Sequence, residues 1–98
     1  MNTNEAAACL ESLGNEKRLN VFQKLVRSGP EGLPVGQLQN HLDIPGSTLS
    51  HHVSNLVSQG LVTQEREGRV LRCCANYQKM NELMAFLTEE CCADVGGC

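Results

Sequence analysis

Apolar residues recur at intervals of three and four along most of the chain, which is the spacing of amphipathic helices. In the fourth such segment, Leu49, Val53 and Leu56 fall on one face of a helical wheel. Glycine and proline separate one segment from the next, and Asn15 is placed to cap the second. The pattern predicts five helices, over residues 5–13, 16–28, 35–42, 47–59 and 81–92.

The pattern changes between the fourth and fifth helices. Residues 61–66 and 69–74 are predicted to be two strands joined across Glu67 and Gly68, and Gly68 can adopt the positive φ that such a turn requires. Two short helices joined by a tight turn and followed by a β-hairpin predict a winged helix-turn-helix, a mainly α fold with a small β-hairpin. We expect residues 1–98 to form this single domain, with residues 91–98 as a flexible tail that carries thiols.

Composition and charge narrow the class of protein. The 98 residues include no Trp, one Tyr and two Phe, so the core must be largely aliphatic. The net charge of −3 argues against a protein that coats nucleic acid through a generally basic surface. Residues 44–79 nevertheless carry more bases than acids, whereas residues 80–98 carry acids alone, so a DNA contact is expected in the middle third. We found neither a membrane-spanning run nor a signal peptide, and we expect a cytoplasmic protein with no membrane partner.

The outward face of the predicted helix over residues 47–59 is the candidate for contact with DNA, because its start would meet base edges and phosphates. Two arginines beside Gly68 are placed for phosphate or minor-groove contact. In the alternative interpretation, the polar side chains are only the solvated face of a surface helix. The expected DNA-binding residues are Ser47, Thr48, Ser50, His51 and Asn55 in the helix and Arg66 and Arg69 in the hairpin.

Two neighbouring residues allow more than one interpretation. Arg72 could contact DNA or equally serve as a strand residue that forms a salt bridge. His52 lies about 60° from the centre of the apolar face of its helix. We therefore interpret His52 as a packed or hydrogen-bonded structural residue rather than as a base contact.

The six cysteines point to metal or redox chemistry in a cytoplasmic chain. Cys73 and Cys74 are consecutive in a predicted strand and point to opposite faces, so we expect one in the core and one at the surface. Cys9 is expected in the core or in a dimer interface. With no Cys-x-x-Cys motif and no anion-binding loop around a cysteine, the sequence does not indicate an enzyme. The remaining three thiols, which could converge on a thiophilic metal or metalloid, are Cys91, Cys92 and Cys98.

The chain resembles the ArsR family of small winged-helix metal sensors. The similar stretches are residues 13–19 (LGNEKRL), 46–53 (GSTLSHHV) and 60–62 (GLV), with the hairpin tip at 67–69 (EGR). The resemblance covers about residues 5–90. It implies a cytoplasmic homodimeric repressor that binds double-stranded operator DNA and releases it when an inducer binds. In such dimers the first and last helices form the interface.

Members of the family sense metals at different places. The positions of the founding arsenic site hold Pro34, Gly36 and Gln39 here, and residues 80–92 lack the Asp and His ligands of the zinc and nickel sites. A third arrangement uses vicinal cysteines at the end of the last helix and one more near the C-terminus to bind arsenite. The residues that match this arrangement are Cys91, Cys92 and Cys98.

Ligand chemistry favours trivalent arsenic as the effector. Structural zinc prefers four ligands, whereas arsenite or antimonite takes three sulfurs and a methylarsenic species needs only two. Adjacent side chains on a regular helix point about 100° apart, so Cys91 and Cys92 can share a ligand only where the helix frays. The alternatives are a repressor that responds to oxidants or persulfide through thiols, and one that responds to soft divalent metals such as cadmium or lead. No catalytic cofactor is expected.

Overall fold

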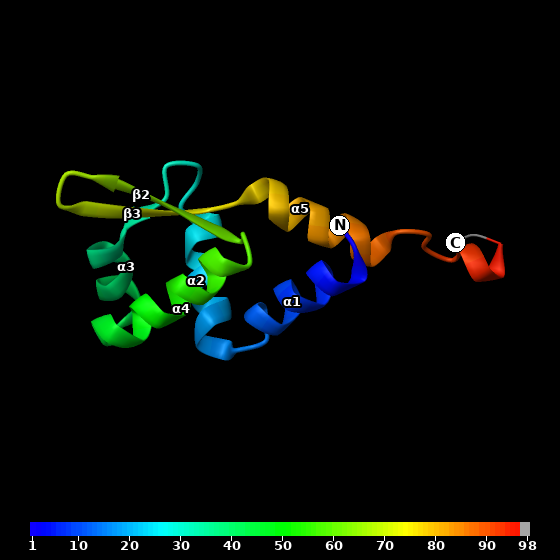
Figure 1. The fold of residues 1–98 in the computed structure, drawn as a ribbon, viewed down its shortest axis with the longest axis horizontal. Coiled ribbons are helices and arrows are strands. Elements are labelled where there is room, and N and C mark those ends of the chain that lie inside the picture. Colours follow the sequence, from blue (N-terminus) through cyan, green and yellow to red (C-terminus); the bar gives the residue numbers. More distant parts are fainter. Residues whose placement is uncertain (97–98) are drawn as a thin grey trace.

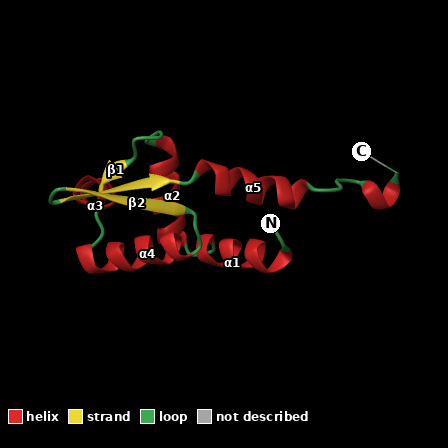
Figure 2. Ribbon diagram, turned by 45° about the horizontal axis from the view of Figure 1, so that its top comes forward, coloured by secondary structure: helices red, strands yellow, loops and turns green. Residues whose placement is uncertain are grey.

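The computed structural model describes residues 1–96 and has the predicted winged helix-turn-helix architecture (Figure 1). Helices outnumber strands, and one small antiparallel sheet packs against them (Figure 2). The elements are α1 (Thr3–Leu13), α2 (Glu16–Arg27), β1 (Leu33–Pro34), α3 (Val35–Leu42), α4 (Gly46–Ser58), β2 (Val62–Glu67), β3 (Val70–Ala75), α5 (Tyr77–Thr88) and a short 3-10 helix, η1 (Ala93–Val95).

Three asparagines set where three of the helices begin. The side chains of Asn2, Asn15 and Asn76 each accept a hydrogen bond from a backbone N–H three residues further on, which satisfies one of the unpaired donors of a helix N-terminus. The predicted cap at Asn15 is confirmed. Because Asn2 also acts as a cap, α1 begins earlier than the apolar pattern indicates.

The last helix lies about four residues earlier than predicted. Its start is fixed by the cap at Asn76 and by the Tyr77 hydroxyl, which donates a hydrogen bond to the Val26 carbonyl at 2.8 Å. Its end is fixed by Glu89, whose ψ of 133° leaves the helical region, and by Glu90, whose φ is 57°. The prediction that the helix runs to residue 92 is therefore wrong, and both vicinal cysteines lie beyond its end.

The sheet has three strands in the order β1-β3-β2, one more than the predicted hairpin. The additional strand, β1, pairs with β3 through only two positions, Leu33 with Cys73 and Pro34 with Arg72. In the hairpin Glu67 pairs with Val70, so the turn consists of Gly68 and Arg69, one residue later than expected. Gly68 has the predicted positive φ, 65°.

The core lies between the helices and the inner face of the sheet, and its side chains are mainly aliphatic. The largest fully buried side chains are Val21, Leu25, Leu38, Leu49, Val53, Leu56, Leu61 and Val62. In α5, by contrast, only Leu83 is buried, and Met84 and Leu87 remain 59% and 57% exposed. Among the described residues, the helices are too short and too polar to span a bilayer.

A close backbone approach at Gly32 joins the loop after α2 to β3. Gly32 is buried and has a φ of 64°. A Cβ atom at this position would overlap the carbonyl oxygen of Cys73 and lie 2.8 Å from the Cys74 sulfur. Only glycine fits here, because both the backbone conformation and the space exclude a side chain.

We expect Gly32→Ala to lower the free energy of unfolding by about 3 kcal/mol, since backbone strain and steric overlap act together. Gly29→Ala is the matched control in the same loop. Gly29 also has a positive φ, 83°, but its Cβ would meet open space among the described residues, so it should cost about 1 kcal/mol. Urea denaturation measures both variants, and equal losses would show that the approach to Cys73 is not tight.

Candidate nucleic-acid interface and thiol tail

Helix α4 presents its predicted outward face to solvent. Leu49, Val53 and Leu56 are at most 1% exposed, whereas Ser47, Ser50 and His51 are exposed and Thr48 is half-buried. We call the β2–β3 hairpin the wing and its turn at Gly68 and Arg69 the wing tip. The start of α4 lies at the same end of the molecule as α3 and the wing tip, at the left of Figure 1. The hydroxyls and the imidazole are therefore accessible to a duplex that approaches this end.

Asn55 has a contact within the protein. Its side-chain oxygen accepts a hydrogen bond of 2.6 Å from the Ser12 hydroxyl, and the Ser12 carbonyl accepts one of 3.0 Å from Arg18 Nη1. These bonds connect α4 to α1 and α2. Asn55 thus has a structural role, and its contact with DNA stays a prediction.

His52 packs inside the protein, as the wheel indicated. It is 7% exposed, and its Nδ1 has no hydrogen-bond partner among the described residues. Burial lowers the pKa of His52, and the nearby charges of Arg18, His51 and Lys17 lower it further. The neutral imidazole is therefore the form that the folded protein favours.

The wing places its arginines in different settings. Arg66 and Arg69 are exposed, and Arg66 points to the face opposite Glu65 and Glu67 because side chains alternate along a strand. Arg72 Nε instead donates to Glu67 Oε1 at 2.7 Å. The salt-bridge interpretation of Arg72 is thus confirmed.

Sequence reasoning missed a set of amides beside the wing. Gln37, Gln39 and Asn40 of α3 line a groove together with Arg69 and Leu71. All three amide residues are exposed, and amides can contact both phosphates and base edges. The signal was present in the sequence, because α3 carries few apolar residues and an almost continuous run of amides.

The vicinal cysteines lie in an irregular turn after α5. Cys91 is exposed and Cys92 is half-buried, with a left-handed φ of 61°. This turn brings their sulfur atoms to 3.6 Å from each other. Two sulfurs bound at about 2.3 Å to one tetrahedral centre lie about 3.8 Å apart, so the spacing suits a shared soft ligand.

The third predicted ligand, Cys98, lies outside the described residues. Cys92 carries a disulfide bond, so its sulfur can donate to a metal only after reduction. Within residues 1–96, no group of three or more His, Cys, Asp or Glu side chains is arranged to hold a metal ion.

The other three cysteines lie within the folded domain and away from the turn after α5. Cys73 is fully buried and Cys74 half-buried on opposite faces of β3, as expected, and burial raises the pKa of both thiols. The Cys74 thiol donates to the Glu31 carbonyl at 3.6 Å. Cys9 is buried in the core, where its thiol donates to the Gln59 carbonyl at 3.8 Å.

We expect stability to fall as the pH drops below about 6.5, because the unfolded chain then protonates His52 while the folded chain, with its lower pKa, does not. His52→Leu should reduce this slope, by at most about 1.4 kcal/mol per pH unit. His41→Gln is the control, because His41 is exposed and is not among the charges that act on His52. Urea denaturation across this pH range measures the slopes, and identical slopes in wild type and H52L would contradict the prediction.

Comparisons with known proteins agree with this geometry. A family model described as "Helix-turn-helix domain" matches residues 13–65. Nodulation protein NolR of Rhizobium meliloti is 29% identical over 84 residues, which cover 86% of this chain and 66% of NolR. A Halobacterium salinarum protein that bears the name of an arsenical resistance operon repressor, ArsR, is 37% identical over 60 residues, 61% of this chain and 46% of that protein. The chain thus spans less than two thirds of the length of these relatives.

Solved structures share the fold over most of their length. An ArsR-like transcriptional regulator from Rhodococcus sp. RHA1 has a TM-score of 0.77 and 24% identity, covering 93% of this chain and 82% of that one. NolR from Sinorhizobium fredii has a TM-score of 0.70 and 30% identity, covering 88% and 83%. The homodimeric winged helix-turn-helix DNA-binding domain of Mb0332 from Mycobacterium bovis has a TM-score of 0.72 and 22% identity, covering 87% and 76%.

Proposed function

Because the chain belongs to the ArsR family of DNA-binding winged-helix transcriptional regulators, we propose that it is a repressor that releases its operator when trivalent arsenic binds its C-terminal thiols. One observation carries the arsenic assignment. The Cys91 and Cys92 sulfurs lie 3.6 Å apart in a turn beyond the end of α5. A regular helix would have directed these side chains apart.

The chemistry of the site favours a metalloid with few ligands. In arsenous acid, each As–OH bond exchanges for an As–S bond, and the thiol proton leaves with the hydroxide as water. Cys91 and Cys92 supply two sulfurs, which suffice for a methylarsenic species, and Cys98 is the proposed third donor for arsenite or antimonite. The exchange requires Cys92 to be reduced, which suits a cytoplasmic protein because the cytoplasm keeps thiols reduced.

The exposed residues at the start of α4 and in the wing support one mode of binding to DNA. The start of α4 enters the major groove with Ser47, Thr48, Ser50 and His51 towards the base edges. Arg66 and Arg69 contact phosphate or the minor groove. In this arrangement the hydroxyls and the imidazole read bases, and the arginines supply most of the affinity that depends on salt.

Exposed apolar side chains on α5 support a homodimer. Met84 and Leu87 lie exposed on α5, and Leu10 lies exposed on α1. The two helices are neighbours, and an ion pair of 3.5 Å joins Lys79 to Glu5 between them (Figure 2). A second copy of the chain would cover these residues. Arsenic binding at the end of α5 would then shift the spacing of the two α4 helices, which must match half-sites about 34–36 Å apart.

We expect Cys91→Ser and Cys92→Ser each to raise the arsenite concentration needed for DNA release by at least about tenfold, because each removes one As–S bond. Cys74→Ser, a half-buried thiol away from the tail, serves as the control and should respond normally. The assay is fluorescence anisotropy of reduced protein on DNA from its own promoter, with arsenite titrated.

The same assay separates the alternative effectors. Antimonite, cadmium, lead, peroxide and polysulfide are titrated in parallel on wild type and both variants. Release by peroxide or polysulfide without release by arsenite would identify a redox repressor, and release by cadmium or lead alone would identify a divalent-metal sensor. An unchanged arsenite response in both C91S and C92S would disprove the thiol site.

We expect Met84→Glu and Leu87→Glu to shift the protein from dimer to monomer, because each places a charge on the apolar face of α5. The dimer dissociation constant should rise at least about tenfold. Val95→Glu is the control, since Val95 is 80% exposed beyond α5. Sedimentation equilibrium measures the change, and a dimer of undiminished affinity in both variants would place the interface elsewhere.

A further inference from the structure

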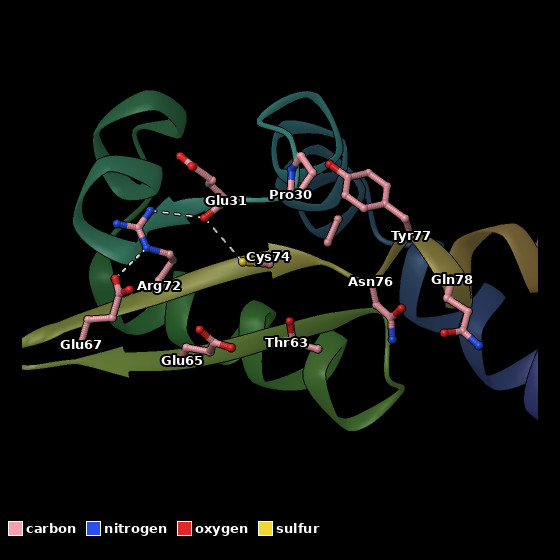
Figure 3. A pocket seen from close by; sticks show the side chains of 11 residues that line it. Pro30, Glu31, Thr63, Glu65, Glu67, Arg72, Cys74, Asn76, Tyr77 and Gln78 are labelled. Atoms are coloured by element: carbon pink, nitrogen blue, oxygen red, sulfur yellow. Dashed lines mark hydrogen bonds and ion pairs between the residues drawn. The ribbon is translucent and has the colours of Figure 1, made fainter.

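The outer face of the sheet is acidic. Glu65 and Glu67 of β2 share this face with Arg72 and Cys74 of β3, and together they border a cavity of 780 Å³ (Figure 3). Glu31, in the loop before β1, lies on the opposite side of this cavity. Three carboxyl side chains and a single guanidinium thus line this cavity, and phosphate is repelled from this side of the wing.

Glu67 is the carboxylate closest to the wing tip. It is the last residue of β2, directly after Arg66 and two residues before Arg69. Unpaired, its negative charge would oppose the attraction of both arginines for phosphate, within the distance over which surface charges interact.

Arg72 connects this carboxylate to the body of the protein. Its Nε donates to Glu67 Oε1 at 2.7 Å, and its Nη1 donates to the Glu31 carbonyl oxygen at 3.3 Å. Figure 3 shows the guanidinium between the two acceptors. The Cys74 thiol donates to the same carbonyl oxygen, so the Glu31 loop holds two residues of β3.

The ion pair between Arg72 and Glu67 contributes little to the stability of the fold. The side chains of Arg72 and Glu67 are 30% and 53% exposed, and ion pairs at such exposure add little to stability. An ion pair beside the tip of the wing instead affects the charge and the position of the tip.

We propose that Arg72 is a positioning residue for DNA binding, which acts by neutralising Glu67 beside the wing tip and tying it to the Glu31 loop. Arg66 and Arg69 then contact phosphates without the opposing negative charge of Glu67. This inference rests on the proposed DNA contacts of Arg66 and Arg69. Arg72 itself does not contact DNA.

The test is a charge cycle of Arg72→Gln, Glu67→Gln and the double variant, measured by anisotropy on promoter DNA at several salt concentrations. R72Q exposes the Glu67 charge and should weaken binding about fivefold, the effect of one surface charge. E67Q should bind DNA at least as tightly as wild type, and the double variant should recover to within about twofold of wild type. A purely structural loss could not be recovered in this way, because E67Q and the double variant both lack the bridge.

The salt dependence separates an indirect role from a direct one. R72Q should keep the wild-type slope of log affinity against log salt, because it loses no phosphate contact. A slope reduced by about one unit, or a loss that E67Q does not recover, would show that Arg72 binds phosphate directly and would overturn the proposal.

Arg66→Gln and Arg69→Gln test the premise in the same assay. Both should weaken binding and reduce the slope. If they do so and R72Q matches wild type, only the role of Arg72 fails. If neither weakens binding, the wing contact fails and the role of Arg72 fails with it. Thermal unfolding of each variant confirms that the compared proteins are folded.

Discussion

The approach of the Gly32 backbone to strand β3 is the constraint on which the rest of the structure depends. β3 is the central strand, paired on one side with β1 and on the other with β2. At the point of closest approach it buries Cys73 in the core and directs Arg72 and Cys74 outwards. The position of the wing relative to α4 therefore follows from how closely this loop and this strand pack.

β3 also joins the two ends of the molecule. It leads directly into Asn76, which caps α5 and whose amide donates to the Gly60 carbonyl at 2.9 Å, just beyond the end of α4. The Asn76 side chain thus joins the first turn of α5 to the residue that follows the C-cap of α4. A displacement of α5 has a short physical path to α4, through hydrogen bonds and covalent chain rather than through loose packing.

The sequence predicted the features that depend on local periodicity and on single residues. The buried face of α4, the cap at Asn15, the positive φ of Gly68 and the opposite orientations of Cys73 and Cys74 all follow from short-range rules. Strand β1 was missed because a two-residue strand has no period. The end of α5 was misplaced because Glu90, a good helix former by propensity, takes a left-handed conformation that the sequence does not indicate.

The sequence indicated that Arg72 could form a salt bridge but did not identify its partner. Glu67 lies on the neighbouring strand, and its pairing with Arg72 depends on how the two strands align. The bond between Ser12 and Asn55 spans 43 positions and depends on how α1 packs against α4. The close spacing of the Cys91 and Cys92 sulfurs likewise depends on the turn that follows α5, which no helical wheel describes.

The turn after α5 lies at the opposite end of the molecule from α3, the start of α4 and the wing tip (Figure 1). If the proposed function holds, an effector captured by Cys91 and Cys92 would not compete with DNA for the same surface. The effector would then bind the repressor while the repressor is still on its operator, and would accelerate its dissociation. Induction would not require the repressor to dissociate from DNA first. The speed of induction would then be set by how fast the thiols react, and not by the residence time of the repressor on DNA.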